Sequence, residues 1–435
     1  MSLATLTSVV QAQPAPPPAD PAPPPANPAP PPAEPPSPST EPTTAPTTAP
    51  PDAPKTPAIP PPVAPAVPAK PSDELPKRLS VAKDSVGAFL NFGLNLQGWF
   101  VYDETIRKAM TGDVTLSAST FRIRRLELSL GGEIIPKFVK YRAMFDPSRV
   151  RDTTTTVTAV NAAGMPVTIR TPAGAVSTLQ DFYITFVSDV AEVSIGQFKN
   201  QISWDGFNSA AKIIMPERAF VANLVGGQRD IGNRIDKTFP KFMYSIGFFN
   251  GAGQNNLDTS NQKDVGLRIE VYPVKGLTIA GATYDSIGYR SRAGTKDRLE
   301  GDLRYENANF LLQSEFIRNR DVFADGAKAI TSQGFYVALA YLIKGVGDGK
   351  LKGDVQPVVR VGYYDPNADT NVDPSMVAAS SFGGNDERTD IEVGLNYYLR
   401  GHEMKFQVSY DRQQFDQSSI KPANNEVIVA TQVWF

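Results

Sequence analysis

Strict alternation of apolar and polar side chains is the feature that most restricts how this chain can fold. In "FLNFGLNLQGWFVY", residues 89–102, leucine, phenylalanine and tyrosine occupy one face of an extended strand, whereas asparagine and glutamine occupy the other. The alternation runs for about twice the length of an average strand in a soluble sheet. A tilted strand that crosses a bilayer needs roughly 9–11 residues, and this stretch is long enough.

The same period recurs along the chain and predicts sixteen strands. They lie at 89–102, 120–131, 137–146, 179–187, 190–198, 229–236, 242–250, 264–273, 277–285, 297–305, 309–318, 332–342, 353–364, 389–399, 403–412 and 427–435. No run of 18 apolar residues is present, so we expect no membrane helix. The pattern predicts an all-β fold, a 16-stranded antiparallel transmembrane β-barrel within residues 77–435.

The connections between these strands alternate in length, which supports the barrel. Connections after odd-numbered strands are long: 103–119, 147–178, 199–228, 251–263, 286–296, 319–331, 365–388 and 413–426. Those after even-numbered strands are tight, such as "SD" at 188–189 and "RGH" at 400–402, with 343–352 as the exception. Long loops at one end and short periplasmic turns at the other are typical of outer-membrane barrels.

Sixteen strands enclose a channel too wide to be filled by apolar side chains. We therefore expect the charged face of each strand to line water and the apolar face to meet lipid. The basic residues expected in the lumen are Arg122, Arg124, Arg125, Lys140, Arg142, Arg268, Arg298, Arg304, Arg318, Arg360 and Lys405. The acidic ones are Glu127, Asp146, Asp181, Glu192, Glu270, Glu300, Asp302, Glu315, Glu392 and Asp411. The two sets nearly cancel, which predicts either a mixed ion-pair network or a clustered selectivity ring.

Two segments interrupt the regular pattern. In "FRIRRLELSL", Ile123 and Leu126 fall on opposite parities, which predicts a β-bulge near Arg124–Arg125. The guanidiniums there could hold phosphate oxygens, or they could pair with nearby carboxylates. Connection 199–228 contains the apolar run "SAAKIIMPERAFVANLV" and is too long for a bare loop. We expect it to be partly helical and either to fold into the lumen or to cap the barrel from outside.

The N-terminal part has a different composition. It holds 28 of the 39 prolines before residue 77, and "PAPPPA" recurs three times. Residues 13–76 are predicted to be a disordered or polyproline II linker that could extend on the order of 200 Å, at about 3.1 Å per residue. We expect a spacer, or a periplasmic tether to the cell wall. Residues 1–12 resemble the end of an export signal, with Val10-Gln11-Ala12 as a small-x-small cleavage site.

Five short stretches resemble the phosphate-selective porin O and P family of Gram-negative outer membranes. They are "FRIRR" at 121–125, "IGQFK" at 195–199, "MPERAFV" at 215–221, "RDIGNRI" at 229–235 and "GFFNGAG" at 247–253. The resemblance implies a 16-stranded porin, a homotrimer, an inward third loop and basic residues that guide small anions such as phosphate. The basic residues in or beside that loop are Lys199, Lys212, Arg218 and Arg229. The dense basic ladder of phosphate-specific members is not evident here.

Other classes of function find little support. The net charge of −2 gives no basic footprint for nucleic acid. The chain has no cysteine and one histidine, His402, in a short turn, so we expect no enzyme, cofactor or metal site. The competing hypothesis is structural: a barrel whose Pro-rich arm anchors the outer membrane to the cell wall.

The chain ends in the alternating strand "EVIVATQVWF". A last strand that closes on an aromatic resembles the signal read by the barrel-insertion machinery. We expect Phe435 to face lipid near the periplasmic rim, among phospholipid and lipopolysaccharide, and Trp434 to face the lumen or its rim. The last strand must pair with the first, because no strand edge is tolerated in lipid.

Overall fold

The computed structural model describes residues 80–83, 89–109, 112–148, 154–160, 166–172, 178–258, 261–287, 294–322, 328–369, 387–416 and 423–435. The predicted export remnant, 1–12, and the Pro-rich segment, 13–76, lie outside these residues. Among the described helices, none combines the length and apolar character needed to cross a bilayer.

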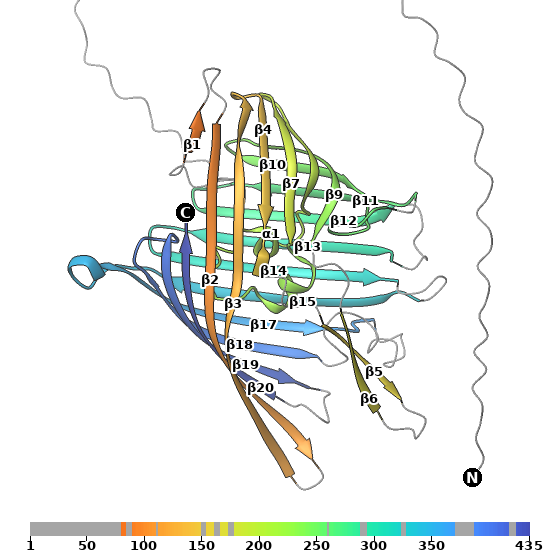
Figure 1. The fold of residues 1–435 in the computed structure, drawn as a ribbon, viewed down its shortest axis with the longest axis vertical. Coiled ribbons are helices and arrows are strands. Elements are labelled where there is room, and N and C mark those ends of the chain that lie inside the picture. Colours follow the sequence, from red (N-terminus) through yellow and green to blue (C-terminus); the bar gives the residue numbers. More distant parts are fainter. Residues whose placement is uncertain are drawn as a thin grey trace, which may run out of the picture. The chain divides into compact units, whose positions relative to one another are not determined.

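The described part of the chain is built mainly from antiparallel strands (Figure 1). In chain order they are β1 (Ser80–Lys83), β2 (Phe89–Ala109), β3 (Gly112–Ile135), β4 (Val139–Phe145), β5 (Thr154–Val160), β6 (Pro166–Pro172), β7 (Leu179–Val187), β8 (Glu192–Lys199), β9 (Arg229–Thr238), β10 (Phe242–Phe249), β11 (Lys263–Val271), β12 (Leu277–Ile287), β13 (Lys296–Glu306), β14 (Phe310–Asp321), β15 (Ile330–Tyr341), β16 (Ile343–Val346), β17 (Gly353–Asp365), β18 (Arg388–Tyr398), β19 (Met404–Phe415) and β20 (Ala423–Trp434). The helices are α1 (Trp204–Phe207), α2 (Phe220–Val225) and the 3₁₀ turn η2 (Gly349–Leu351).

Sixteen of these strands form a closed ring, and each corresponds to a strand predicted from the sequence. The ring leaves out β1, β5, β6 and β16, and every neighbouring pair within it is antiparallel. It closes where β2 pairs with β20, from Asn95 opposite Trp434 to Ile106 opposite Ala423. Closure leaves no strand edge along this seam, which satisfies the backbone inside a bilayer. The prediction of a 16-stranded barrel is confirmed.

The two faces of the strands differ as the alternation predicted. On β13, Arg298 and Glu300 are 4% and 3% exposed, whereas Leu299 between them is 57% exposed. On β18, Ile391, Val393 and Leu395 expose their side chains on the outer face. Apolar side chains therefore face outward, where lipid would cover them, and charged side chains face the lumen.

The first long connection is not a loop, so that prediction was wrong. The β2–β3 ladder continues from Tyr102 opposite Ser119 to Ala109 opposite Gly112. Pairing of β2 with β20 stops at Ile106, so the end of the hairpin is a two-stranded ribbon beyond the barrel wall. The sequence there is rich in small and polar residues and reads as a loop, although main-chain pairing alone sustains the ribbon.

The predicted bulge is present in β3. Gln97 lies opposite Arg125 and Gly98 lies opposite Ile123, so Arg124 is the extra residue. One inserted residue reverses the parity of the strand. Arg122 and Arg125 therefore both point inward, and the outward side chains are Ile123 before the bulge and Leu126 after it. The bulge thus brings three arginines to the inner side of the wall, where Arg124 and Arg125 meet the inward segment.

Candidate functional site

The connection between β8 and β9, residues 199–228, folds into the barrel, and we call it the inward segment. It starts and ends at neighbouring positions, because Lys199 pairs with Arg229. It contains α1 and α2, which confirms that part of it is helical. The two helices meet through glycine: a Cβ on Gly206 would lie 2.2 Å from Cα of Gly226. The hypothesis that this segment caps the barrel from outside was wrong.

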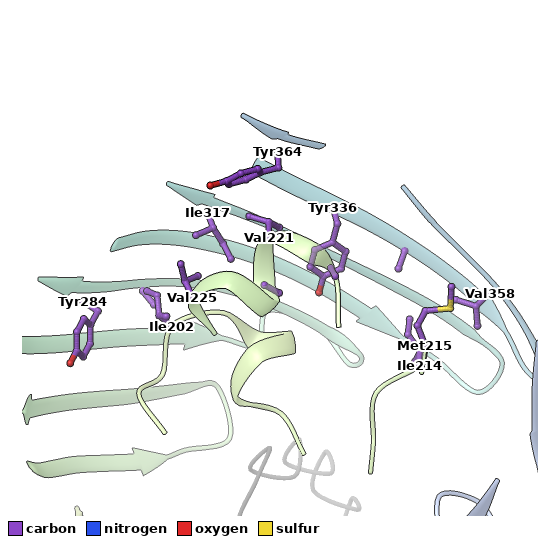
Figure 2. Close-up of a cluster of buried hydrophobic side chains, with 14 of the residues drawn as sticks. Ile202, Ile214, Met215, Val221, Val225, Tyr284, Ile317, Tyr336, Val358 and Tyr364 are labelled. Carbon is purple, nitrogen blue, oxygen red and sulfur yellow. The ribbon is translucent and has the colours of Figure 1, made fainter. Parts of the chain in front are cut away.

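One side of the inward segment is apolar and packs against the wall (Figure 2). Figure 2 shows Ile202, Val221 and Val225 around the two helices, facing Ile317 and Tyr336 on strands of the wall. Met215 and Ile214 lie further along the segment beside Val358 of β17. A fully buried aliphatic side chain contributes about 1.5–3 kcal/mol. This packing explains why an apolar run occurs in a connection and why it cannot remain in the water of the lumen.

A second set of contacts holds the main chain of the inward segment. Six wall side chains from β2, β17, β18, β19 and β20 donate hydrogen bonds to carbonyl oxygens of the segment. The pairs are Gln97 to Ala210 (3.1 Å), Gln432 to Ala211 (3.0 Å), Lys405 to Ile213 (2.9 Å), Asn396 to Ile214 (2.7 Å), Gln407 to Ile214 (3.3 Å) and Arg360 to Glu217 (3.0 Å). Because these donors are buried, each bond also satisfies a polar group that would be costly to leave unpaired. We call this row the carbonyl anchor.

A buried carboxylate of β14 fixes the start of α1. The Glu315 oxygens accept hydrogen bonds from Ser203 Oγ at 2.7 Å, from the Asp205 backbone N–H at 2.6 Å and from Tyr336 OH at 2.8 Å. Ser203 also accepts from the Gly206 N–H and so caps the helix. The segment is thus tied to the wall at both its helical and its extended part.

The bulge arginines meet the inward segment at Glu217. Its carboxylate receives Arg124 Nη2 at 2.7 Å and Arg125 Nη2 at 3.0 Å. Burial raises the pKa of the Glu217 carboxyl, but the charges of Arg125, Arg124 and Arg218 together outweigh burial and lower the pKa to about 2. Arg124 and Arg125 therefore pair with a carboxylate, the second of the two arrangements predicted. Arg122 is exposed, with its guanidinium carbon 4.9 Å from the ring centroid of Trp99.

Two of the predicted guiding residues, Arg218 and Lys212, lie within the inward segment but away from the cavity. Arg218 donates to the carbonyls of Asp205 at 2.6 Å and Asn208 at 2.7 Å. Burial and the nearby charge of Arg125 lower the pKa of Arg218 to about 10. Lys212 Nζ lies 5.8 Å from the ring centroid of Trp434. Neither residue lines the cavity of about 60 Å³ described below.

Most of the predicted lumen arginines form ion pairs along the wall, as the mixed-network alternative predicted. Arg268 is fully buried and pairs with Glu270 and Glu300, both at 2.8 Å, and with Asp302. Arg304 pairs with Glu270 at 3.0 Å and Asp302 at 2.8 Å. Further pairs join Arg298 to Asp321 (2.6 Å), Arg360 to Glu392 (2.6 Å) and Lys140 to Glu192 (3.9 Å).

Arg318 was placed in the lumen from the sequence, and this was wrong. It lies on the outer face of β14, beside Phe316, and pairs with Asp369 at 3.1 Å. Glu315 faces inward on the same strand, and an odd separation of three residues puts the two side chains on opposite faces of a regular strand.

Between the inward segment and the opposite wall lies a cavity of about 60 Å³. Four basic and two acidic side chains line it: Arg142, Lys199, Arg229, Arg234, Glu127 and Asp181. Asp181 accepts from Arg229 at 2.6 Å and lies 3.6 Å from Arg142. Lys199 Nζ instead donates to three carbonyls, those of Gly206, Phe207 and Asn208, at 3.2–3.3 Å. Three acceptors match the three N–H groups of an ammonium, so this positive charge is held without a carboxylate.

Comparison with known proteins identifies this architecture. The family model of the phosphate-selective porin O and P matches residues 95–299 and 290–433. The chain belongs to this family. It is an outer-membrane porin, and its fold and family are those of a channel rather than an enzyme.

Solved structures share the fold of this porin at low sequence identity. The outer-membrane channel DcaP of Acinetobacter baumannii matches with a TM-score of 0.51 and 14% identity over 82% of this chain and 100% of that one. An anion-selective porin from Comamonas acidovorans matches with 0.51 and 13%, over 80% and 100%. Salmonella typhi OmpF, in complex with daunomycin, matches with 0.55 and 12%, over 82% and 100%. A comparison with curated protein sequences gave no match.

Of the basic residues expected in the lumen or beside the inward loop, Lys199, Arg229 and Arg142 line the cavity; Arg234 also lines it but was not predicted from the sequence. Arg234 pairs with Asp236 at 2.9 Å, and its guanidinium carbon lies 4.7 Å from the ring centroid of Phe198. The exposed Ile235 between the two charges is the signal that could have found it, since alternation puts both neighbours inward. The amide donors of the carbonyl anchor carry no charge and gave no comparable signal.

The C-terminus completes the seam of the barrel. Phe435 and Leu94 exchange backbone hydrogen bonds of 2.8 and 3.0 Å, and the rings of Phe435 and Phe92 lie 6.3 Å apart. Trp434 lines the cavity, as predicted. His402 lies in the short turn before β19, where burial and then the charge of Lys405 lower its pKa to about 3.

Proposed function

We propose that this porin passes small anions in preference to cations. The observation that carries the proposal is the lining of the cavity beside the inward segment, where four basic side chains meet two acidic ones. An excess of arginine and lysine at the narrow section of a pore lowers the energy of an anion there and raises that of a cation.

The arrangement of the charges supports the same preference. Asp181 is occupied by two arginines, Arg229 and Arg142, so its negative charge is offset locally. Lys199 is held only by backbone carbonyls, and within the described residues it forms no ion pair. Basic side chains therefore outnumber acidic ones around the cavity by two, and this excess of positive charge favours an anion there.

Reversal potentials in planar bilayers with a KCl gradient test the proposal. Wild-type protein should give stepwise conductance and a reversal potential of the sign set by chloride. Arg142→Gln should lower the chloride-to-potassium permeability ratio by about two- to fivefold, since it removes one charge of a net excess of two. Lys140→Gln is the matched control, because Lys140 lies two residues earlier on β4, pairs with Glu192 and does not line the cavity.

Either of two outcomes would contradict the proposal. Cation preference of the wild-type channel would refute the anion preference and leave the porin itself intact. An equal change in Lys140→Gln and Arg142→Gln would mean that overall charge, rather than the cavity, sets the preference.

The preference should not be specific for phosphate. Most of the lumenal arginines are already paired with carboxylates, so they do not form an uninterrupted basic path. We expect phosphate added to a chloride solution to reduce the current only at concentrations comparable to chloride. A block at micromolar phosphate would instead indicate a dedicated phosphate site.

We further propose a homotrimer, inserted by the barrel-insertion machinery through the strand that ends at Phe435 and surrounded by phospholipid and lipopolysaccharide. The Pro-rich residues 13–76 would extend into the periplasm, where they could reach the cell wall. The support is the closing position of Phe435 in the barrel seam and the proline content of the arm.

A further inference from the structure

The turn between β15 and β17, residues 343–352, is unlike the other turns at its end of the barrel. It carries its own strand, β16, and the 3₁₀ turn η2, and Figure 1 shows it extending beyond the neighbouring turns. Every residue from 343 to 352 is exposed. A pore would not require such an extension, because a tight turn suffices to join two adjacent strands.

The turn follows directly on the lipid-facing surface. Leu339 and Tyr341 of β15 are exposed on the outer face, and Ile343 continues the same parity at 45% exposure. On β18 the exposed side chains of Val393 and Leu395 place Tyr397 on the outer face as well. The Tyr397 hydroxyl donates to the carbonyl of Leu351, which ties the end of the turn to this outer surface. Outward tyrosines at strand ends mark the level of the lipid headgroups.

The side chains of the turn suit an anionic lipid surface. Ile343, Val346 and Leu351 are 45%, 40% and 68% exposed, so apolar area is available for the boundary of the acyl chains. Three lysines accompany them: Lys344, Lys350 and Lys352. Within the described residues these lysines form no ion pair. The two nearby aspartates are Asp348 and Asp354, and Asp354 accepts the Gly345 N–H at 2.9 Å.

We propose that residues 343–352 bind anionic phospholipids of the periplasmic leaflet. The lysine ammonium groups contact the lipid phosphates, while Ile343, Val346 and Leu351 enter the region between headgroups and acyl chains. A lysine near an anionic membrane surface and a partly buried apolar side chain both contribute to such binding. A soluble partner or the cell wall would not explain why apolar side chains of the turn continue the lipid-facing band.

Lipid retention by the full-length porin tests the role of the lysines. The protein is purified in a mild detergent with added cardiolipin or phosphatidylethanolamine, and bound lipid is counted by native mass spectrometry. The triple variant Lys344→Gln/Lys350→Gln/Lys352→Gln should bind cardiolipin at least about tenfold more weakly than the wild type. Added salt should abolish this difference between variant and wild type. The matched control is Lys137→Gln/Lys241→Gln/Lys275→Gln, which removes three exposed lysines from three separate turns at the same end.

Equal loss in the two triple variants, or no loss in the first, overturns the proposal. Loss of binding to soluble peptidoglycan fragments, with cardiolipin binding unchanged, would also overturn it and identify the cell wall as the partner. Unchanged single-channel conductance shows that each variant has folded and inserted.

A spin label tests the apolar part separately. The chain has no cysteine, so Leu351→Cys gives a single labelling site. In vesicles with anionic lipid, the label should relax more with oxygen than with a water-soluble nickel chelate, whereas a label at Lys275→Cys should show the reverse. Accessibility to the nickel chelate equal to that at Lys275→Cys would place the turn in water and contradict the proposal.

Discussion

Glu217 is the residue on which the contact between the bulge and the inward segment depends. Its carboxylate is paired with Arg124 and Arg125, and its pKa is lowered to about 2. A carboxyl whose pKa is depressed on folding stabilises the folded state above its unfolded pKa of 4.5, and this contribution is lost as the pH falls toward 2.

We therefore predict that Glu217→Gln destabilises the folded porin by about 3 kcal/mol at pH 7, the free-energy equivalent of the pKa shift. The loss should shrink to well below about 1 kcal/mol by pH 2, because about half of the wild-type carboxyl groups are then protonated in the folded state. The measurement is the temperature at which the folded barrel loses its compact gel mobility, at pH 7, 4 and 2. Glu306→Gln, at the exposed end of β13, is the control and should show little change. A loss for Glu217→Gln that is independent of pH would contradict the prediction.

At the scale of the elements, the carbonyl anchor fixes the inward segment through its main chain. Lys405 is fully buried on β19 and donates to the Ile213 carbonyl, but it does not line the cavity. Its contribution should therefore concern the mobility of the segment rather than ion preference. Glu315 holds the segment at the start of α1 by accepting the backbone N–H of Asp205.

Lys405→Met should accordingly increase current noise and brief closures at least severalfold, because a buried carbonyl loses its donor. The reversal potential should stay within a few millivolts of the wild type, since the charge removed is not on the cavity. Single-channel recordings give both quantities. Lys140→Met is the control, since Lys140 pairs with Glu192 and not with the segment. A shifted reversal potential with unchanged noise would argue against an anchoring role.

The strands were predictable because one face of every strand meets water and the other meets lipid. Polar and apolar side chains therefore alternate along the sequence. The charged groups were harder, because the alternation gives a side chain's face and not its partner. Arg268 and Lys199 both point inward, yet one is neutralised by three carboxylates and the other is held by carbonyls. The β2–β3 ribbon was missed because main-chain pairing outside the wall requires no apolar face.

At the scale of the whole molecule, the barrel depends on its last residue to complete the seam. Deleting Phe435 removes two backbone hydrogen bonds to Leu94 and the ring contact with Phe92. We predict that the yield of inserted barrel falls severalfold or more, while inserted molecules keep wild-type conductance. Heat-modifiable mobility of membrane fractions measures the yield, and bilayer recording measures the conductance. Normal yield with altered conductance would exclude the assembly role.

The Pro-rich arm provides a test at the same scale. Deletion of residues 13–72 should leave conductance and ion preference unchanged if the arm is a tether, but it should release the porin from purified cell-wall sacculi. A changed conductance would instead mean that the arm reaches the pore. Unchanged co-sedimentation with sacculi would remove the support for a cell-wall tether.

The carbonyl anchor has a consequence for how this porin can change. Every amino acid, proline included, offers the same carbonyl oxygen, so the anchor donors recognise the path of residues 210–217 independently of their side chains. Substitutions of Lys212, whose side chain takes no part in the anchor, should therefore be tolerated well, whereas Glu217 and the buried donors that face this stretch should tolerate few. New solute preferences could arise by exchanging side chains on a fixed backbone, without redesign of the barrel that holds it.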